Sequence, residues 1–127
     1  MNYYFSAQIE KSFDEALDVV KEALKKEGFG VLTEIDVKAT MKKKLDVDFR
    51  NYRILGACNP PFAHQALQAE DKIGTMLPCN VIVQELDGRV EVAAIDPVAS
   101  MQAVENPDLA EVTSAIQQKL KAVIESL

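Results

Sequence analysis

The sequence predicts an α+β fold: a two-layer sandwich with a mainly antiparallel or mixed sheet and helices on one of its faces. Two observations predict this class. Extended and helical patterns alternate in the order β-α-β-α-β-α-β-β-α, with a short extra helix before the last one. Residues 78–96 form two extended runs joined by Asp87-Gly88, a favoured tight turn, and such a hairpin argues against an entirely parallel sheet.

The first strand and the first helix are predicted near the N-terminus. Residues 3–8 are rich in aromatic side chains and predict a short strand. Ser12 and Glu15 have the spacing of a capping box, in which each side chain satisfies a backbone N–H at the other position, so a helix begins there. Its apolar stripe consists of Phe13, Leu17, Val20 and Leu24. Gly28 can take the left-handed conformation that ends a helix.

The middle of the chain predicts a second strand, a short helix and a third strand. Residues 29–35 form an extended run, and Asp36 is suited to cap the helix that follows. The apolar face of this helix consists of Val37, Met41 and Leu45. Its lysines are predicted to face solvent. Residues 51–58 predict the third strand, which ends at Cys58.

Two further helices are predicted on either side of the hairpin. Asn59 is expected to cap the first, with Pro60 at the first helical position, where a missing N–H costs little. The apolar side of this helix consists of Phe62, Ala63, Ala66 and Leu67, with Gly74 near its end. A weak helical pattern runs through residues 98–104, and Asn106-Pro107 opens the final helix. That helix carries Leu109, Val112, Ile116, Leu120 and Val123 at helical spacing.

Size and composition limit the class of protein. A chain of 127 residues with 48% hydrophobic side chains can bury a core without a metal or a disulfide, so one domain over residues 1–127 is predicted. No basic start precedes an apolar run, and no stretch approaches the ~20 apolar residues that span a bilayer. We therefore expect a cytoplasmic protein with reduced thiols. The net charge of −6 opposes binding to nucleic acid or to an anionic membrane.

The charge is distributed unevenly. Residues 38–53 hold six basic and two acidic side chains, whereas the rest of the chain holds eight basic and 18 acidic ones. The basic residues of this segment are Lys38, Lys42, Lys43, Lys44, Arg50 and Arg53. The local excess fits a solvated helix end and turn, but it also fits an anionic ligand or an acidic face of a partner subunit.

Three stretches give the chain a resemblance to a known family. They are ILGACNPPFAHQAL at 54–67, IGTMLPCNVIV at 73–83 and AAIDP at 93–97. With these stretches and with its N-terminal order of helix and strand, the chain resembles the Domain of Unknown Function 302 family over nearly its whole length. The resemblance implies a small α+β domain that associates as a homodimer through its sheet. It implies no settled activity, because the family is itself uncharacterised, and any cofactor stays unknown.

The candidate site lies where the reactive side chains gather. Both cysteines, the single histidine and three of the five prolines fall within residues 56–81. If the third and fourth strands are neighbours, the Cys58-Asn59 and Cys79-Asn80 pairs converge at one end of the sheet. Amide side chains and free helix N–H groups there suit a small ligand, including an anionic one. The predicted binding residues are Cys58, Asn59, His64, Cys79, Asn80 and Asp96.

Two alternative functions stay open. Cys58 precedes a predicted helix N-terminus, which favours a thiolate, so a thiol-dependent redox or metal-handling protein using Cys58 and Cys79 is the first. Cys58 also fits a small buried side chain that ends a strand. No metal is expected, because the cysteines lack the close pairing of zinc motifs; if one binds, its ligands are Cys58, Cys79 and His64.

The second alternative is a structural or regulatory protein-interaction module. The apolar stretch from Tyr52 to Ala57 fits a subunit interface as well as it fits an ordinary sheet core. No catalytic triad, P-loop or dinucleotide-binding glycine pattern is recognisable. The sequence therefore favours a binding or interaction protein over an enzyme.

Overall fold

A computed structural model, which describes residues 2–127, shows five strands in one sheet with the order β1-β5-β4-β3-β2. Every neighbouring pair of strands is antiparallel. The strands are β1 (Tyr4–Ile9), β2 (Gly30–Asp36), β3 (Tyr52–Cys58), β4 (Cys79–Leu86) and β5 (Arg89–Ile95). The predicted α+β class is confirmed, and the sheet is antiparallel throughout.

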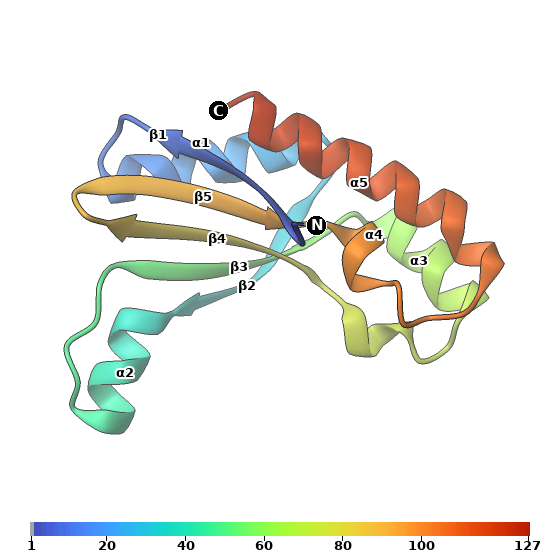
Figure 1. The fold of residues 1–127 in the computed structure, drawn as a ribbon, viewed down its shortest axis with the longest axis horizontal. Coiled ribbons are helices and arrows are strands. Elements are labelled where there is room, and N and C mark those ends of the chain that lie inside the picture. Colours follow the sequence, from blue (N-terminus) through green and yellow to red (C-terminus); the bar gives the residue numbers. More distant parts are fainter. Residues whose placement is uncertain (1) are drawn as a thin grey trace.

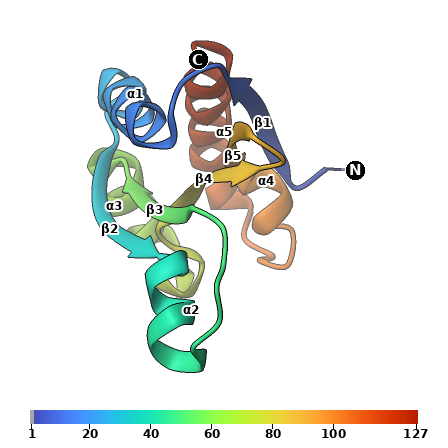
Figure 2. The same cartoon turned by 90° about the vertical axis from the view of Figure 1, so that its left-hand side faces the viewer.

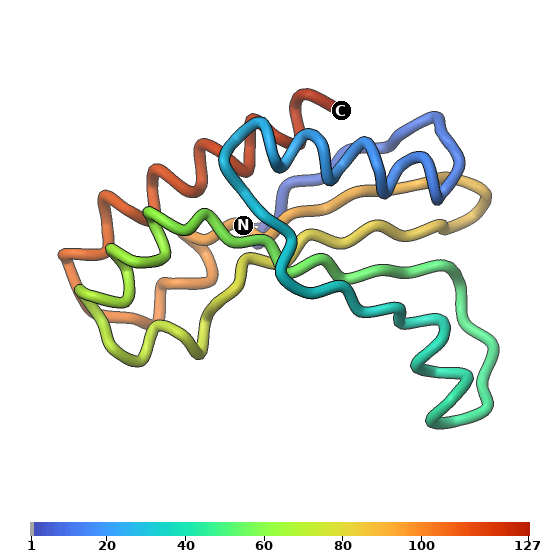
Figure 3. Tube along the Cα trace, turned by 180° about the vertical axis from the view of Figure 1, so that it is seen from behind, coloured from blue at the N-terminus to red at the C-terminus, as the bar shows by residue number. Residues whose placement is uncertain are grey.

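The helices lie in three places relative to this sheet. They are α1 (Phe13–Lys26), α2 (Val37–Leu45), α3 (Pro60–Ala69), α4 (Pro97–Ser100) and α5 (Ala110–Glu125), with the 3₁₀ turns η1 (Ile73–Met76) and η2 (Pro107–Leu109). Helices α1 and α5 cover one face, while α3 and α4 lie beyond one end of the sheet (Figure 1). Helix α2 stands apart at the opposite end (Figure 3). Within residues 2–127, no helix combines the length and the apolar character needed to cross a bilayer.

The main core lies between the sheet and the helices α1 and α5. Alternate side chains of a strand point to opposite faces, and one set from the central strands is buried against the two helices. This set includes Leu55, Ala57, Val81, Val83, Val92 and Ala94. The helices contribute Phe13, Leu17, Val20, Leu24, Ile116, Leu120 and Val123. The apolar stripe predicted for the first helix is therefore confirmed in full.

The start and the end of α1 follow the predicted signals with one difference. Ser12 Oγ accepts a hydrogen bond from the Glu15 N–H at 3.2 Å, as an N-cap should. The Glu15 carboxylate accepts from the Ser12 hydroxyl at 2.9 Å, whereas a full capping box would use the Ser12 N–H. Gly28 has a φ of 86°, the left-handed conformation expected after the helix.

Helix α2 has the predicted cap but not the predicted packing. Asp36 Oδ1 accepts from the Ala39 N–H at 3.0 Å. None of the helix's residues is buried, and Leu45 is 67% exposed. The predicted apolar face of α2 therefore does not pack against the core. After β2 the chain leaves the sheet to form α2, and it rejoins the sheet only at β3 (Figure 1). We call residues 37–51 the arm.

Within residues 2–127, no helix layer covers the sheet face opposite α1 and α5 (Figure 2). Ile35 pairs with Ile54 and Ile54 pairs with Ile82, so these three side chains share one face. They alternate with the buried Leu55 and Val81, which places them on the face away from the helices. Tyr4, Tyr52, Ala93 and Ile95 occupy the same face by their register. We call this surface the open face.

Candidate functional site

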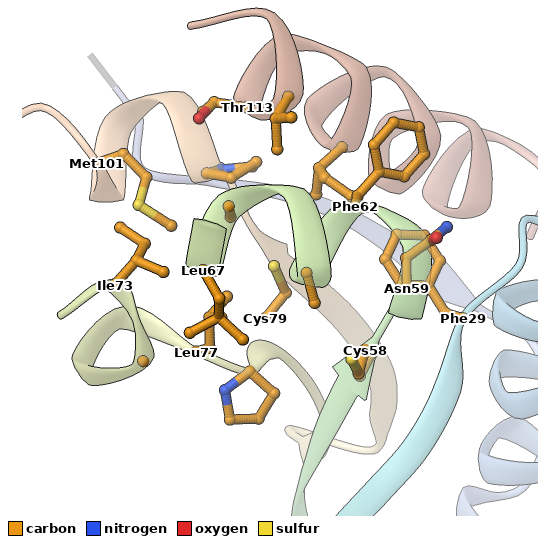
Figure 4. A pocket seen from close by; sticks show the side chains of 18 of the residues that line it. Phe29, Cys58, Asn59, Phe62, Leu67, Ile73, Leu77, Cys79, Met101 and Thr113 are labelled. Atoms are coloured by element: carbon orange, nitrogen blue, oxygen red, sulfur yellow. The ribbon is translucent and has the colours of Figure 1, made fainter. Parts of the chain in front are cut away.

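A cavity of about 340 Å³ lies where β3 ends and β4 begins, between α3 and α5 (Figure 4). Among the described residues 2–127, twenty line it, and none of these has a charged side chain. Its walls include Phe29, Phe62, Leu67, Leu77, Met101 and Ile116. The polar groups among the lining side chains are the amide of Asn59, the hydroxyl of Thr113 and the two thiols. The arrangement is that of an apolar binding pocket with few polar contacts.

The pairing of β3 and β4 brings the two halves of the cysteine region together. Ala57 faces Cys79 in the antiparallel register, so Cys58 follows at the end of β3 while Cys79 begins β4. Both cysteines are half-buried, free and part of the cavity wall. The predicted convergence of Cys58 and Cys79 at one end of the sheet is therefore observed.

A second apolar cluster closes the cavity on the side away from the main core. Ala66 of α3, Ile73 of η1 and Leu109 of η2 are buried together there. Leu77, Met101, Val104 and Val112 pack against them. Helix α3 thus lies over the cavity at the end of the sheet. Its residue Ala66 both lines the cavity and belongs to the second cluster. The space beneath it remains as the cavity.

Burial determines the chemistry of Cys79. Desolvation, with a smaller contribution from nearby Cys58, raises the pKa of the Cys79 thiol to about 11. A thiol with that pKa stays protonated at neutral pH, and the thiolate is the nucleophilic form. Cys79 therefore behaves as an apolar wall residue and not as an activated nucleophile.

Asn59 occupies the N-cap position of α3, but its side chain does not cap the helix. No capping bond is made by its side chain, which instead donates from Nδ2 to the Glu27 carbonyl oxygen at 3.2 Å. This corrects the sequence prediction of a side-chain cap. The amide joins the turn after α1 to the start of α3. Only 7% of Asn59 is exposed, and it lines the cavity.

Three predicted site residues lie outside the cavity wall. His64 is exposed on α3. Asn80 is exposed and faces Gly56 on the open face, because it follows Cys79 by one residue and strand side chains alternate. Asp96 is buried and structural: its Oδ1 accepts from the Val98 N–H at 3.0 Å and from Gln117 Nε2 at 3.1 Å. It thereby caps α4 and ties it to α5.

The ligand set predicted for a metal is not assembled. Among residues 2–127, no group of three or more His, Cys, Asp or Glu side chains could hold a metal ion. Cys58 and Cys79 share a cavity, whereas His64 is on the exposed side of α3. The combination of Cys58, Cys79 and His64 therefore does not form a three-ligand site.

The basic segment also lies away from the cavity. Helix α2 is at the end of the sheet opposite α3 and α4 (Figures 1 and 3). Lys42 is paired with Asp46 at 2.9 Å, and Arg53 is paired with Glu34 and Asp36. These cations therefore add no charge to the cavity wall.

Several cavity residues escaped the sequence interpretation. Phe62, Ala63, Ala66 and Leu67 were predicted to form the apolar side of a helix. Their partners across the cavity, Met101 and Thr113, are more than thirty positions further along the chain. Nothing in the local pattern around Thr113 distinguishes it from a residue on an ordinary amphipathic helix.

Comparisons with known proteins agree with this architecture. The family model described as Domain of unknown function DUF302 matches residues 5–127. A solved structure, an uncharacterized conserved protein DUF302 from Bacillus stearothermophilus, is similar with a TM-score of 0.91 and 27% sequence identity. The similarity covers 98% of this chain and 98% of that one. No curated protein matches the chain.

Proposed function

We propose that this chain, which belongs to the family Domain of unknown function DUF302, binds a small and mainly apolar ligand in the cavity beneath α3. The observation that carries the proposal is a cavity of about 340 Å³ with twenty lining residues and no charged side chain. Ligand pockets are commonly apolar, with volumes of roughly 300–1,000 Å³ and a few placed polar groups. The proposed role is binding, with no reaction assigned.

The same observation argues against an anionic ligand in this cavity. A carboxylate or phosphate loses its hydration when it is buried, and it needs a cation or several donors in return. Neither Lys, Arg nor His lines the cavity, and the cations of residues 38–53 lie at the other end of the sheet. The sequence analysis left the charge of the ligand open and included anionic molecules. We now propose a neutral, mainly apolar ligand.

Filling the cavity tests the proposal. Gly74 lines the cavity and a Cβ there would meet no atom within 4 Å, so Gly74→Leu should occupy space without a clash. Gly30 is equally open but does not line the cavity, so Gly30→Leu is the matched control. Native mass spectra should show an organic mass on the wild type and on Gly30→Leu, and lose it in Gly74→Leu. If neutral apolar compounds neither bind nor stabilise the wild type, the proposal fails.

The thiol alternative has one supporting observation, because Cys58 and Cys79 line the same cavity. The raised pKa of Cys79 weakens it, since that thiol is a poor source of thiolate at neutral pH. The two functions differ in their response to Cys58→Ala combined with Cys79→Ala. An apolar binding site keeps its ligand in the double variant, whereas thiol-dependent chemistry is abolished.

We also propose that two copies associate through the open face. Its exposed apolar side chains include Tyr4 and Ile35, at 37% and 47% exposure. Residues 38–53 have a net positive charge, and the rest of the chain is strongly negative. The arm of one copy is therefore attracted to the acidic remainder of another copy. A twofold dimer uses such a complementary pair twice.

Sedimentation equilibrium tests this association. The wild type should be a dimer that weakens at high salt, since exposed charge pairs are screened. Ile82→Lys, in the middle of the open face, should give a monomer. Ala122→Lys is the control, because Ala122 is exposed on α5, on the side of the sheet opposite the open face. A wild type that is monomeric at every concentration would refute the dimer and leave the face for a different protein partner.

We assign the protein to the cytoplasm because its two cysteines are free, and unpaired thiols are usual in reducing compartments. Fractionation of the source cells with an antibody to this chain tests the assignment. Recovery outside the cytoplasmic fraction would contradict it.

A further inference from the structure

We propose that the ligand of the cavity carries a hydrogen-bond donor, an N–H or O–H group, that bonds to Oδ1 of Asn59. The inference rests on the proposed function and narrows it to one chemical class: neutral molecules with an apolar body and one donor. It depends on the orientation of a single buried amide, on the size of the cavity and on the absence of charge from the cavity wall.

The Glu27 carbonyl fixes which end of the Asn59 amide is engaged by the protein and which end is left for another partner. A carbonyl oxygen only accepts hydrogen bonds, so the Asn59 group that contacts it at 3.2 Å must be the NH₂ group. The oxygen Oδ1 therefore points away from Glu27. Only 7% of the Asn59 surface is exposed. Among residues 2–127, none donates a hydrogen bond to Oδ1.

This oxygen is not sealed inside the protein. Within residues 2–127, no fully buried side-chain nitrogen or oxygen is without a partner. Since Oδ1 has no protein donor, it must retain contact with solvent, and Asn59 is part of the cavity wall (Figure 4). A buried acceptor that loses water without gaining a donor costs about 1–3 kcal/mol. A ligand that fills the cavity therefore has to supply a donor or bear that cost.

Close packing holds the amide in place. A Cβ on Gly28 would lie 3.1 Å from Asn59 Nδ2, which is tighter than nine in ten real contacts of a Cβ atom. The amide thus fits against the bare backbone of Gly28 and is tied to the preceding residue, Glu27. An acceptor that is already oriented costs a ligand little ordering entropy. Asn59 is thereby a suitable specificity determinant.

The cavity volume sets the size of the apolar body. An apolar cavity of ~150 Å³ holds benzene. A cavity of about 340 Å³ accommodates roughly two fused rings or an aliphatic chain of similar bulk. Indole is a suitable probe because it has two rings and one N–H donor, and benzothiophene is its near-isostere without a donor. The chain contains no Trp, so the fluorescence of added indole can be followed directly.

The test measures indole binding to the intact wild-type protein and its displacement by benzothiophene. We expect indole to bind about three- to tenfold more tightly, the effect of one net hydrogen bond. A purely apolar cavity gives the opposite order, because the indole N–H loses its hydration without compensation. Equal binding, or tighter binding of benzothiophene, overturns the inference but supports the proposed function. Binding of neither compound, or of any other neutral apolar probe, overturns both.

Two variants assign the donor preference to Asn59. Asn59→Leu removes the acceptor at similar volume and should abolish or reverse the preference for indole. Thr113→Val removes the hydroxyl group of the wall and should leave that preference unchanged. Loss of the preference only in Thr113→Val would move the contact to Thr113 and refute the assignment. Because Asn59→Leu also removes the bond to Glu27, the comparison of the two probes on the wild type is sufficient if that variant does not fold.

Discussion

Cys79 faces Ala57 across the β3–β4 ladder, and Cys58 is the next residue along β3, so the two thiols of the chain belong to one end of the sheet. Their proximity does not make them reactive. Cys58 adds to the desolvation that raises the pKa of the Cys79 thiol to about 11. The raised pKa has two measurable consequences: it slows the alkylation of Cys79, and it makes the free energy of unfolding depend on alkaline pH.

Alkylation of Cys79 should be slow at neutral pH. With a pKa of about 11, its thiolate fraction at pH 7.5 is about 100-fold below that of an ordinary cysteine. Iodoacetamide labelling of Cys58→Ala, followed by mass spectrometry, measures Cys79 alone. The rate should rise about tenfold per pH unit towards pH 10. Labelling as fast as in the urea-unfolded protein would contradict the burial of this thiol.

The same group makes stability depend on alkaline pH. The pKa of Cys79 rises from 9.0 to about 11 on folding, so the unfolded chain loses the proton first as the pH increases. The stabilising preference for the neutral thiol is complete below pH 9 and is lost between pH 9 and pH 11. Urea unfolding should show a loss of about 2–3 kcal/mol from this group over that range. Cys79→Ala should lack this component, and identical pH slopes for both proteins would refute it.

Gly28→Ala should destabilise the protein by about 1–3 kcal/mol. Gly28 has a φ of 86°, and a Cβ there approaches the Asn59 amide to 3.1 Å, so the substitution strains the backbone and displaces the amide. Gly30→Ala is the control, because its Cβ would meet nothing within 4 Å. Unfolding in urea measures both. Equal stability of the two variants would show that the Gly28 turn tolerates a side chain.

Acid stability should depend on Glu34. The hydrogen bond from Lys21, and then that from Arg53, lowers the pKa of the Glu34 carboxyl below its usual 4.5. The Lys21 Nζ–Glu34 Oε1 distance is 2.8 Å. The stabilisation is present above pH 4.5 and is lost as the pH falls through the lowered pKa. Because the pair is partly exposed, we expect about 0.5 kcal/mol.

In urea unfolding, the free energy of unfolding of Glu34→Gln should therefore fall less steeply below pH 4.5 than that of the wild type. Glu22→Gln, at an exposed carboxylate of α1, is the control and should follow the wild-type curve. Parallel curves for Glu34→Gln and the wild type would contradict the role of the Lys21 pair.

Local signals predicted most of the fold. The turn at Asp87-Gly88 needs positive φ at both residues, and these are 53° and 74°. Asp36 caps α2 and Ser12 caps α1 because capping depends on residues within a few positions. The hydrophobic stripe of α1 reports its buried face directly. Such features are determined by nearby sequence and can be predicted from it.

The site was predicted less completely because it depends on the faces of the sheet. Cys79 and Asn80 are adjacent in sequence, yet one lines the cavity and the other lies on the open face. The exposure of Leu45 follows from the departure of α2 from the sheet, which no periodicity reports. Asn59 binds the Glu27 carbonyl, 32 positions earlier, instead of its own helix. Each of these outcomes is set by tertiary contacts.

The pairing of β1 with β5 determines how long β1 lacks its partner strand while the protein is being synthesised. β1 pairs only with β5 in the described sheet, from Tyr4 opposite Ile95 to Ile9 opposite Val90. At 5–20 residues per second, a ribosome needs about 4 to 17 seconds after finishing β1 to produce the whole of β5. During that interval β1 lacks its partner strand, although β2, β3 and β4 are all translated before β5. The pairing at this edge therefore joins the first strand translated to the last one.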